Sequence, residues 1–116
     1  MVQRGRDEDE KKKRMQKFEE EKAARARRIA EGKIRVRLQE IFSGESGRES
    51  YWVVKEAVVF ERLIEGYKAR FYPNWRDRGL FFRLQLDGNW IDPSATPQTL
   101  ELEDDYDTLD MYVMPW

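Results

Sequence analysis

The fold is decided by the stretch FFRLQLDGNWIDPSATPQTLELEDDYDTLDMYV, residues 81–113. Apolar and polar residues alternate at its start, so that Leu84 and Leu86 face a core and their neighbours face solvent, as in a half-buried strand. The pair Asp87-Gly88 is typical of a tight turn and leads into a short strand at Trp90-Ile91. PSATPQTLEL is expected to form a loop and a short helix, and TLDMYVM then predicts a closing strand.

Two strands and a helix are predicted before this stretch. KIRVRLQE (Lys33 to Glu40) alternates strictly, and YWVVK (Tyr51 to Lys55) is aromatic and β-branched, so both are expected to be strands. Between them SGESGRES (Ser43 to Ser50) has turn chemistry, which predicts a hairpin with a long loop. Apolar residues then recur at helical spacing from Phe60 to Phe71, which indicates an amphipathic helix of about fourteen residues that ends before Pro73.

The order of these elements predicts the fold class. Strand, strand, helix, strand, short strand, turn of helix and strand give a mixed sheet with one helix packed across it, an α+β fold. The helix has no other surface on which to bury its apolar stripe. A chain of 116 residues has room for one such domain, and we expect residues 33–116 to form it.

Residues 1–32 differ in composition and are expected to form a charged helical arm or linker. They carry eleven Lys and Arg against eight Asp and Glu, whereas residues 33–116 carry eleven against fifteen. Strong helix formers without Pro or Gly from Asp7 to Ala30 predict a helix, for which Gly32 is a plausible end. Its few apolar residues give only weak support for a coiled-coil partner; they are Met15, Phe18 and Ile29.

Two functional interpretations of the arm stay open beside that of a solvated helix. Lys11 to Arg14 is similar to a short nuclear-import signal. The stretch from Arg25 to Arg37 could contact nucleic-acid phosphates, although Glu19 to Glu21 weaken this idea.

Composition excludes several classes of function. The chain has no Cys and no His, which removes disulfides, thiolate metal sites, the usual zinc sites and His-dependent triads. The acidic run Glu101 to Asp110 lacks the central Gly and terminal Glu of a calcium loop, and no paired base or nucleophile accompanies it. We therefore interpret it as a solvated acidic turn and expect no cofactor, no metal and no enzymatic activity.

Membrane and secretory signals are not found either. No apolar run approaches the roughly 18 residues of a membrane span, and charge stands where a signal peptide needs its apolar stretch. The expectation is a soluble intracellular protein, nuclear or cytoplasmic, with no membrane partner.

Residues 81–113 resemble the second half of SUMO. SUMO proteins have a similar strand, an acidic-Gly turn like Asp87-Gly88, a "Thr-Pro-x-x-Leu" segment like that at Thr96, an acidic cluster and a final strand. FERLIEGYKAR, residues 60–70, is similar to the SUMO helix. The resemblance implies a ubiquitin-like β-grasp and a role in binding other proteins.

One departure from SUMO bears on function. Ubiquitin and SUMO are conjugated through a terminal Gly-Gly, whereas this sequence reads Met114-Pro115-Trp116 and could not be conjugated as written. It is similar in kind to the non-conjugated SUMO-like domains of the RENi family of genome-stability proteins, which implies docking on the SUMO-conjugating enzyme. Two alternatives are a modifier that has lost its Gly-Gly tail and a nucleic-acid-binding module that uses the arm with Arg35 and Arg37.

The resemblance implies a first binding site on the exposed face of the sheet. This face is expected to present Arg35, Arg37 and Tyr112, with Asp87 on the acidic residue before the turn glycine. The positions that match the SUMO surface for the conjugating enzyme are Arg83, Asp87, Gly88, Asp107 and Asp110. The alternative interpretation is that Asp87-Gly88 is only a good turn and the other residues form a solvated face.

A second site is implied between the second strand and the helix. That strand is expected to be a sheet edge, which can accept an added peptide strand. In SUMO the groove receives short hydrophobic-acidic motifs, and Val53 stands where SUMO has a lysine. The matching apolar lining is Trp52, Val54, Leu63 and Tyr67, and the matching basic rim is Lys55, Arg62 and Arg70. Core packing is the alternative role for part of this set.

Overall fold

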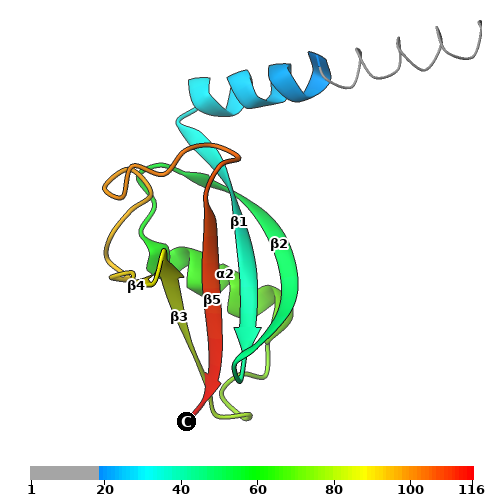
Figure 1. Cartoon of the computed structure of the whole chain (residues 1–116), viewed down its shortest axis with the longest axis vertical. Coiled ribbons are helices and arrows are strands. Elements are labelled where there is room, and N and C mark those ends of the chain that lie inside the picture. The colour runs from blue at the N-terminus through cyan, green and yellow to red at the C-terminus, as the bar shows by residue number, and fades with distance from the viewer. Residues whose placement is uncertain (1–18) are drawn as a thin grey trace, which may run out of the picture. The chain divides into compact units, whose positions relative to one another are not determined.

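Figure 1 shows the computed structural model of the chain, which describes residues 19–116. The chain divides into two units, Met1–Glu31 and Gly32–Trp116, and each is described by itself. In the first unit residues 19–30 are helical, and Ile29 is 53% exposed. Gly32 has φ +69°, the left-handed conformation in which glycine commonly ends a helix. The rest of the predicted helix, with Met15, Phe18 and Lys11 to Arg14, lies outside the described residues.

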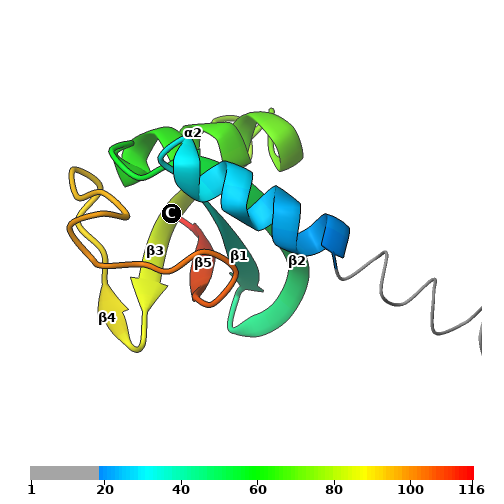
Figure 2. The same cartoon turned by 90° about the horizontal axis from the view of Figure 1, so that it is seen from above.

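The second unit is a five-stranded sheet with one helix. Its elements are β1 (Lys33–Phe42), β2 (Glu45–Lys55), α2 (Phe60–Phe71), β3 (Leu80–Leu86), β4 (Asn89–Trp90) and β5 (Thr108–Pro115). The strand order is β2-β1-β5-β3-β4; β1 and β5 pair in parallel, and the other pairs are antiparallel. α2 lies across one face of this sheet (Figure 2). This is the ubiquitin-like β-grasp, and the predicted α+β fold is confirmed.

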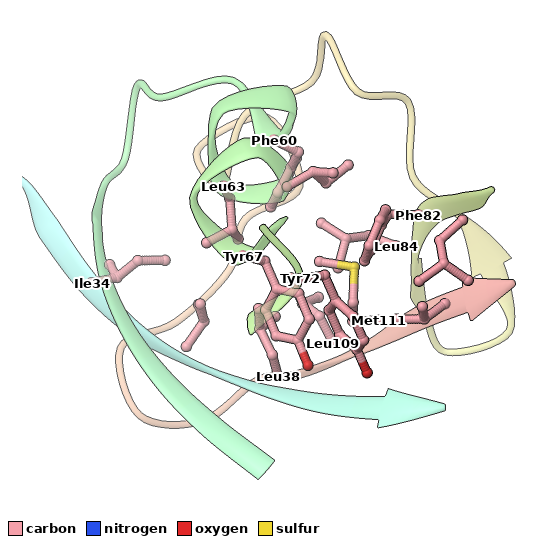
Figure 3. Packing of buried hydrophobic residues seen from close by; sticks show 14 residues of the cluster. Ile34, Leu38, Phe60, Leu63, Tyr67, Tyr72, Phe82, Leu84, Leu109 and Met111 are labelled. Atoms are coloured by element: carbon pink, nitrogen blue, oxygen red, sulfur yellow. The ribbon is translucent and has the colours of Figure 1, made fainter. Parts of the chain in front are cut away.

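The core lies between α2 and the covered face of the sheet (Figure 3). The alternation predicted for β1 and β5 is confirmed, because every second residue is buried from Ile34 to Glu40 and from Leu109 to Val113. α2 contributes the residues that recur at helical spacing, and each large apolar side chain adds roughly 1.5–3 kcal/mol on burial. The buried hydrophobic residues of these three elements are Ile34, Val36, Leu38, Phe60, Leu63, Ile64, Tyr67, Leu109, Met111 and Val113.

One carboxylate is buried in this core. Glu40 is 5% exposed, and its Oε1 accepts a hydrogen bond of 2.5 Å from the hydroxyl of Tyr67. Arg48 Nη1 lies 4.0 Å from the same oxygen. Burial, followed by the hydrogen bond to Glu40, raises the pKa of Tyr67 far above its usual value, and the same two causes raise that of Tyr72. A Cβ at Gly47 would lie 3.2 Å from Glu40 Oε2, so glycine lets β2 pass close to this group.

The prediction of a long loop between the first two strands is wrong. β2 begins at Glu45, which pairs with Phe42, so only Ser43 and Gly44 form the turn. Both have positive φ, 50° and 84°, as a two-residue hairpin turn requires. The turn-forming residues 45–50 are tolerated because β2 is an edge strand and a register shift between Gln39 and Ile41 interrupts its pairing there.

The short helix predicted in PSATPQTLEL is also wrong, because residues 97–101 form turns. The backbone N–H of Thr96 donates to Thr99 Oγ1 at 3.0 Å, and that of Thr99 donates to Thr96 Oγ1 at 3.2 Å. Threonine side chains thus take up backbone donors, which favours turns over helix. α2 has 12 residues rather than about fourteen, and β4 begins at Asn89, one residue earlier than predicted.

Candidate protein-interaction surfaces

The face of the sheet opposite α2 carries a cluster of polar and aromatic side chains. The guanidinium of Arg83 lies 4.2 Å from the ring centroid of Trp90, which is 44% exposed. The ring of Trp90 contacts that of Tyr112 edge to face at 5.0 Å. Tyr112 in turn donates a hydrogen bond of 3.1 Å to Gln85 Oε1. Sequence reasoning placed Arg83 and Tyr112 here but missed Trp90, because a two-residue strand gives no alternation to read.

The acidic residues predicted for this face lie in different settings. Asp110 pairs in register with Gln85 and so adjoins the aromatic cluster. Asp87 and Gly88 form the exposed β3–β4 turn, with φ 49° and 83°. Asp107 precedes β5, and its Oδ2 accepts a hydrogen bond of 2.7 Å from the backbone of Glu103. The structure therefore uses the carboxylate of Asp107 to hold a turn, which sequence spacing did not reveal.

Arg35 and Arg37 also lie on this face, but both are engaged. Arg35 forms an ion pair with Asp105 and lies 5.3 Å from the ring centroid of Tyr51. Arg37 Nε donates to the Thr108 hydroxyl at 3.0 Å. A polar cavity of about 220 Å³ opens beside them and is lined by Arg37, Tyr51, Asp105, Tyr106, Asp107 and Thr108.

The predicted groove between β2 and α2 is present. β2 is the edge of the sheet, and beside it lies a depression of about 250 Å³. Gly66 contributes no side chain to its floor, and a Cβ there would contact the ring of Trp52 at 3.5 Å. The lining residues are Trp52, Val53, Val54, Lys55, Val58, Arg62, Leu63 and Gly66.

Two residues predicted for the groove lie elsewhere. Tyr67 is fully buried, and its hydroxyl is bound to Glu40, so it belongs to the core rather than to the lining. Tyr67 follows Gly66, which lines the groove, and consecutive residues of a helix are rotated by about 100° around its axis, so the Tyr67 side chain points into the core. Arg70 is not among the lining residues of the groove. It lies next to the groove, because its guanidinium is 5.4 Å from the ring centroid of Trp52, which lines it.

The acidic run Glu101 to Asp110 is not simply solvated, contrary to the prediction. Asp104 is 5% exposed, and its Oδ1 accepts a hydrogen bond of 2.7 Å from the backbone of Arg35. Asp105 donates its backbone N–H to the Arg35 carbonyl at 2.8 Å. The run is thereby hydrogen-bonded to the backbone of β1 near its first residue.

Within residues 19–116 no group of three or more acidic side chains is placed to hold a metal ion. Over the same residues, no helix is long and apolar enough to span a bilayer.

Comparison with known proteins adds a likeness of fold. No protein-family model matches the chain, and no curated protein matches it. A solved structure described as "Molecular Mimicry of SUMO promotes DNA repair" is similar, with 22% sequence identity and a TM-score of 0.48. The match covers 71% of this chain and 90% of that one. A likeness with a TM-score below 0.5 carries no conclusion about this chain.

Proposed function

We propose that residues 33–116 form a non-catalytic, SUMO-like protein-interaction domain that docks on the SUMO-conjugating enzyme through the open face of its sheet. Residues 1–32 are the charged arm of this arrangement. The partner and a nuclear location follow from the resemblance of residues 81–113 to SUMO and to the domains of genome-stability proteins.

The observation that carries the proposal is the cluster of Arg83, Trp90 and Tyr112 beside the Asp87-Gly88 turn. Arginine and large aromatic residues dominate the binding energy of protein interfaces when they are packed against one another and then desolvated. Here the guanidinium already lies 4.2 Å from the Trp90 ring centroid, and the two rings already meet edge to face at 5.0 Å, so little side-chain freedom remains to be lost on binding. The exposed carboxylate of Asp87 adds a charge that selects a basic partner surface.

An NMR titration with the SUMO-conjugating enzyme tests this proposal. We expect the enzyme to shift the resonances of Arg83, Trp90 and Tyr112, and Asp87→Arg to weaken binding at least tenfold, or about 1.4 kcal/mol. Glu61→Arg reverses an exposed charge on α2, on the other side of the sheet, and is the matched control, with affinity expected within twofold of wild type. Equal binding by Asp87→Arg, or no shift on the sheet face, contradicts the proposal.

The groove supports a second candidate function, the capture of an extended hydrophobic-acidic peptide. Its supporting observation is that an apolar depression adjoins the unpaired edge of β2, where an added strand gains main-chain hydrogen bonds. Val53, which is 54% exposed at this edge, offers a direct test. Val53→Lys should bind an acidic-tailed peptide about two- to fivefold more tightly, the range of an exposed ion pair. A peptide with Gln and Asn in place of its acids should show no gain, and a gain for both peptides would contradict an ionic cause.

A further inference from the structure

The β1–β2 turn, the end of α2 and the loop 72–79 lie at one end of the domain (Figure 1). Five cationic residues belong to β2, the last turns of α2 and this loop. Neither of the two surfaces described above includes the whole set. We call this surface the basic end, and it comprises Arg48 of β2, Lys68 and Arg70 of α2, and Arg76 and Arg78 of the loop.

Every cation of the basic end lies over an aromatic ring. Arg48 and Arg70 lie 4.1 and 4.8 Å from the ring centroid of Phe71. Lys68 and Arg76 lie 4.0 and 5.1 Å from that of Trp75. Arg78 lies 5.5 Å from that of Tyr72. Stacking of this kind holds a cation in place, and the four arginines of the set are exposed, so their N–H groups can bind an anion.

The loop that carries two of these cations is held by its own backbone. The N–H of Arg78 donates to the Asn74 carbonyl at 3.1 Å, and that of Gly79 donates to the Arg76 carbonyl at 3.1 Å. Trp75 anchors the loop to the core, since its ring meets that of Phe82 edge to face at 6.5 Å. The positions of the cations are therefore set before any ligand binds, which lowers the entropic cost of binding.

The charge of the basic end is compensated in part, because two of its five cations have carboxylate partners and Asp77 stands between Arg76 and Arg78. Lys68 pairs with Glu65 at 3.5 Å, and Arg48 lies 4.0 Å from Glu40. No carboxylate of residues 19–116 forms a salt bridge with Arg70, Arg76 or Arg78. Cations spread over three elements suit a chain of phosphates better than one phosphate group.

An exposed indole beside these cations indicates which polyanion fits. Trp116 is 88% exposed, and its backbone N–H donates to the carbonyl of Gly79 at 2.7 Å, next to Arg78. Its ring lies 5.3 Å from that of Phe81, which supports it from one side. Nucleobases stack on such rings, whereas an acidic peptide would use the arginines but not the indole. We propose that the basic end binds single-stranded nucleic acid, with phosphates on Arg76 and Arg78 and a base on Trp116.

Fluorescence anisotropy of a labelled oligothymidylate with the full chain tests this proposal. Arg76→Gln with Arg78→Gln should weaken binding at least tenfold and lower the slope of log K against log salt by about 1.4, since each single-strand phosphate contact contributes about 0.7. Trp116→Ala should weaken binding about tenfold through lost stacking. The matched control, Lys55→Gln with Arg62→Gln, makes the same charge change at the groove and should stay within twofold.

The same assay separates charge from fold and from other occupants. Arg76→Lys with Arg78→Lys keeps both charges and should bind within about threefold of wild type, while circular dichroism checks that each variant is folded. The proposal is overturned in favour of the arm if Arg76→Gln with Arg78→Gln binds as wild type does and binding is lost only when the Lys and Arg of residues 1–32 are neutralised. Displacement by oligoglutamate as readily as by unlabelled oligothymidylate overturns it in favour of an acidic peptide. The titration with the conjugating enzyme measures binding at the sheet face that lies opposite α2, and it uses other variants. The proposal for the basic end and the proposed function can therefore fail independently of each other.

Discussion

Replacing Glu40 by alanine should lower the free energy of unfolding by about 2 kcal/mol or more, since a buried polar group left without its partner costs about 1–3 kcal/mol. The carboxylate is 5% exposed and accepts the hydroxyl of Tyr67 at 2.5 Å. Removing the carboxylate leaves the buried Tyr67 hydroxyl without its acceptor. Burial and Glu40 also raise the pKa of Tyr72, so the variant changes the surroundings of a second tyrosine. Urea unfolding followed by tryptophan fluorescence measures the change.

Two further variants isolate the cause. Glu40→Gln keeps an acceptor of the same shape and should recover part of the loss. Glu49→Ala removes an exposed glutamate of β2, whose Oε1 lies 3.9 Å from Arg37 Nη1, and should cost no more than about 1 kcal/mol. Equal losses from Glu40→Ala and Glu49→Ala would show that the buried network does not hold the domain together.

Above pH 10 the free energy of unfolding should fall steeply. The folded state raises the pKa of Tyr67 and Tyr72 through burial and then through Glu40, whereas tyrosines of the unfolded chain titrate near pH 10. Between the unfolded and the folded pKa the unfolded state binds fewer protons, so stability decreases with pH, by up to about 1.4 kcal/mol per pH unit for each group. The stabilising contribution is complete below pH 10 and is lost as the pH rises towards the folded pKa.

Urea unfolding between pH 8 and 11.5 measures this slope. Tyr67→Phe removes one of the two titrating hydroxyls and should make the slope shallower by up to about 1.4 kcal/mol per pH unit. Tyr51→Phe is the matched control, because it removes the hydroxyl of a residue that is 57% exposed on the other face of the sheet. A slope that is the same in wild type and Tyr67→Phe would exclude Tyr67 as its source.

The prediction of the fold was right where a local periodicity decides the structure. It was wrong where pairing between strands decides the structure. Ile34, Val36 and Leu38 alternate with polar residues, and the structure buries all three. Residues 45–50 have the composition of a loop, yet they are strand because β1 offers them main-chain partners. Of the candidate sites, the edge position of β2 and the Asp87-Gly88 turn were predictable, since both depend on strand order and turn chemistry.

Side-chain partnerships could not be predicted in this way. Tyr67 was assigned to the groove because helical spacing gives the side of the helix on which a residue lies. It does not show whether the side chain is exposed there or buried. Glu40 follows the inward alternation of β1, but Tyr67, which donates the hydrogen bond to it, lies 27 residues along the chain.

Local patterns of apolar residues and turn residues were thus enough to give the order of the elements, the α+β class and the resemblance to SUMO. Tertiary contacts alone decided which surfaces exist: Arg83 over Trp90 on paired strands, the groove between β2 and α2, and the cations over Phe71 and Trp75. The physical reason is that periodicity reports the environment of one residue, whereas a binding surface consists of contacts between residues that only the folded chain brings together.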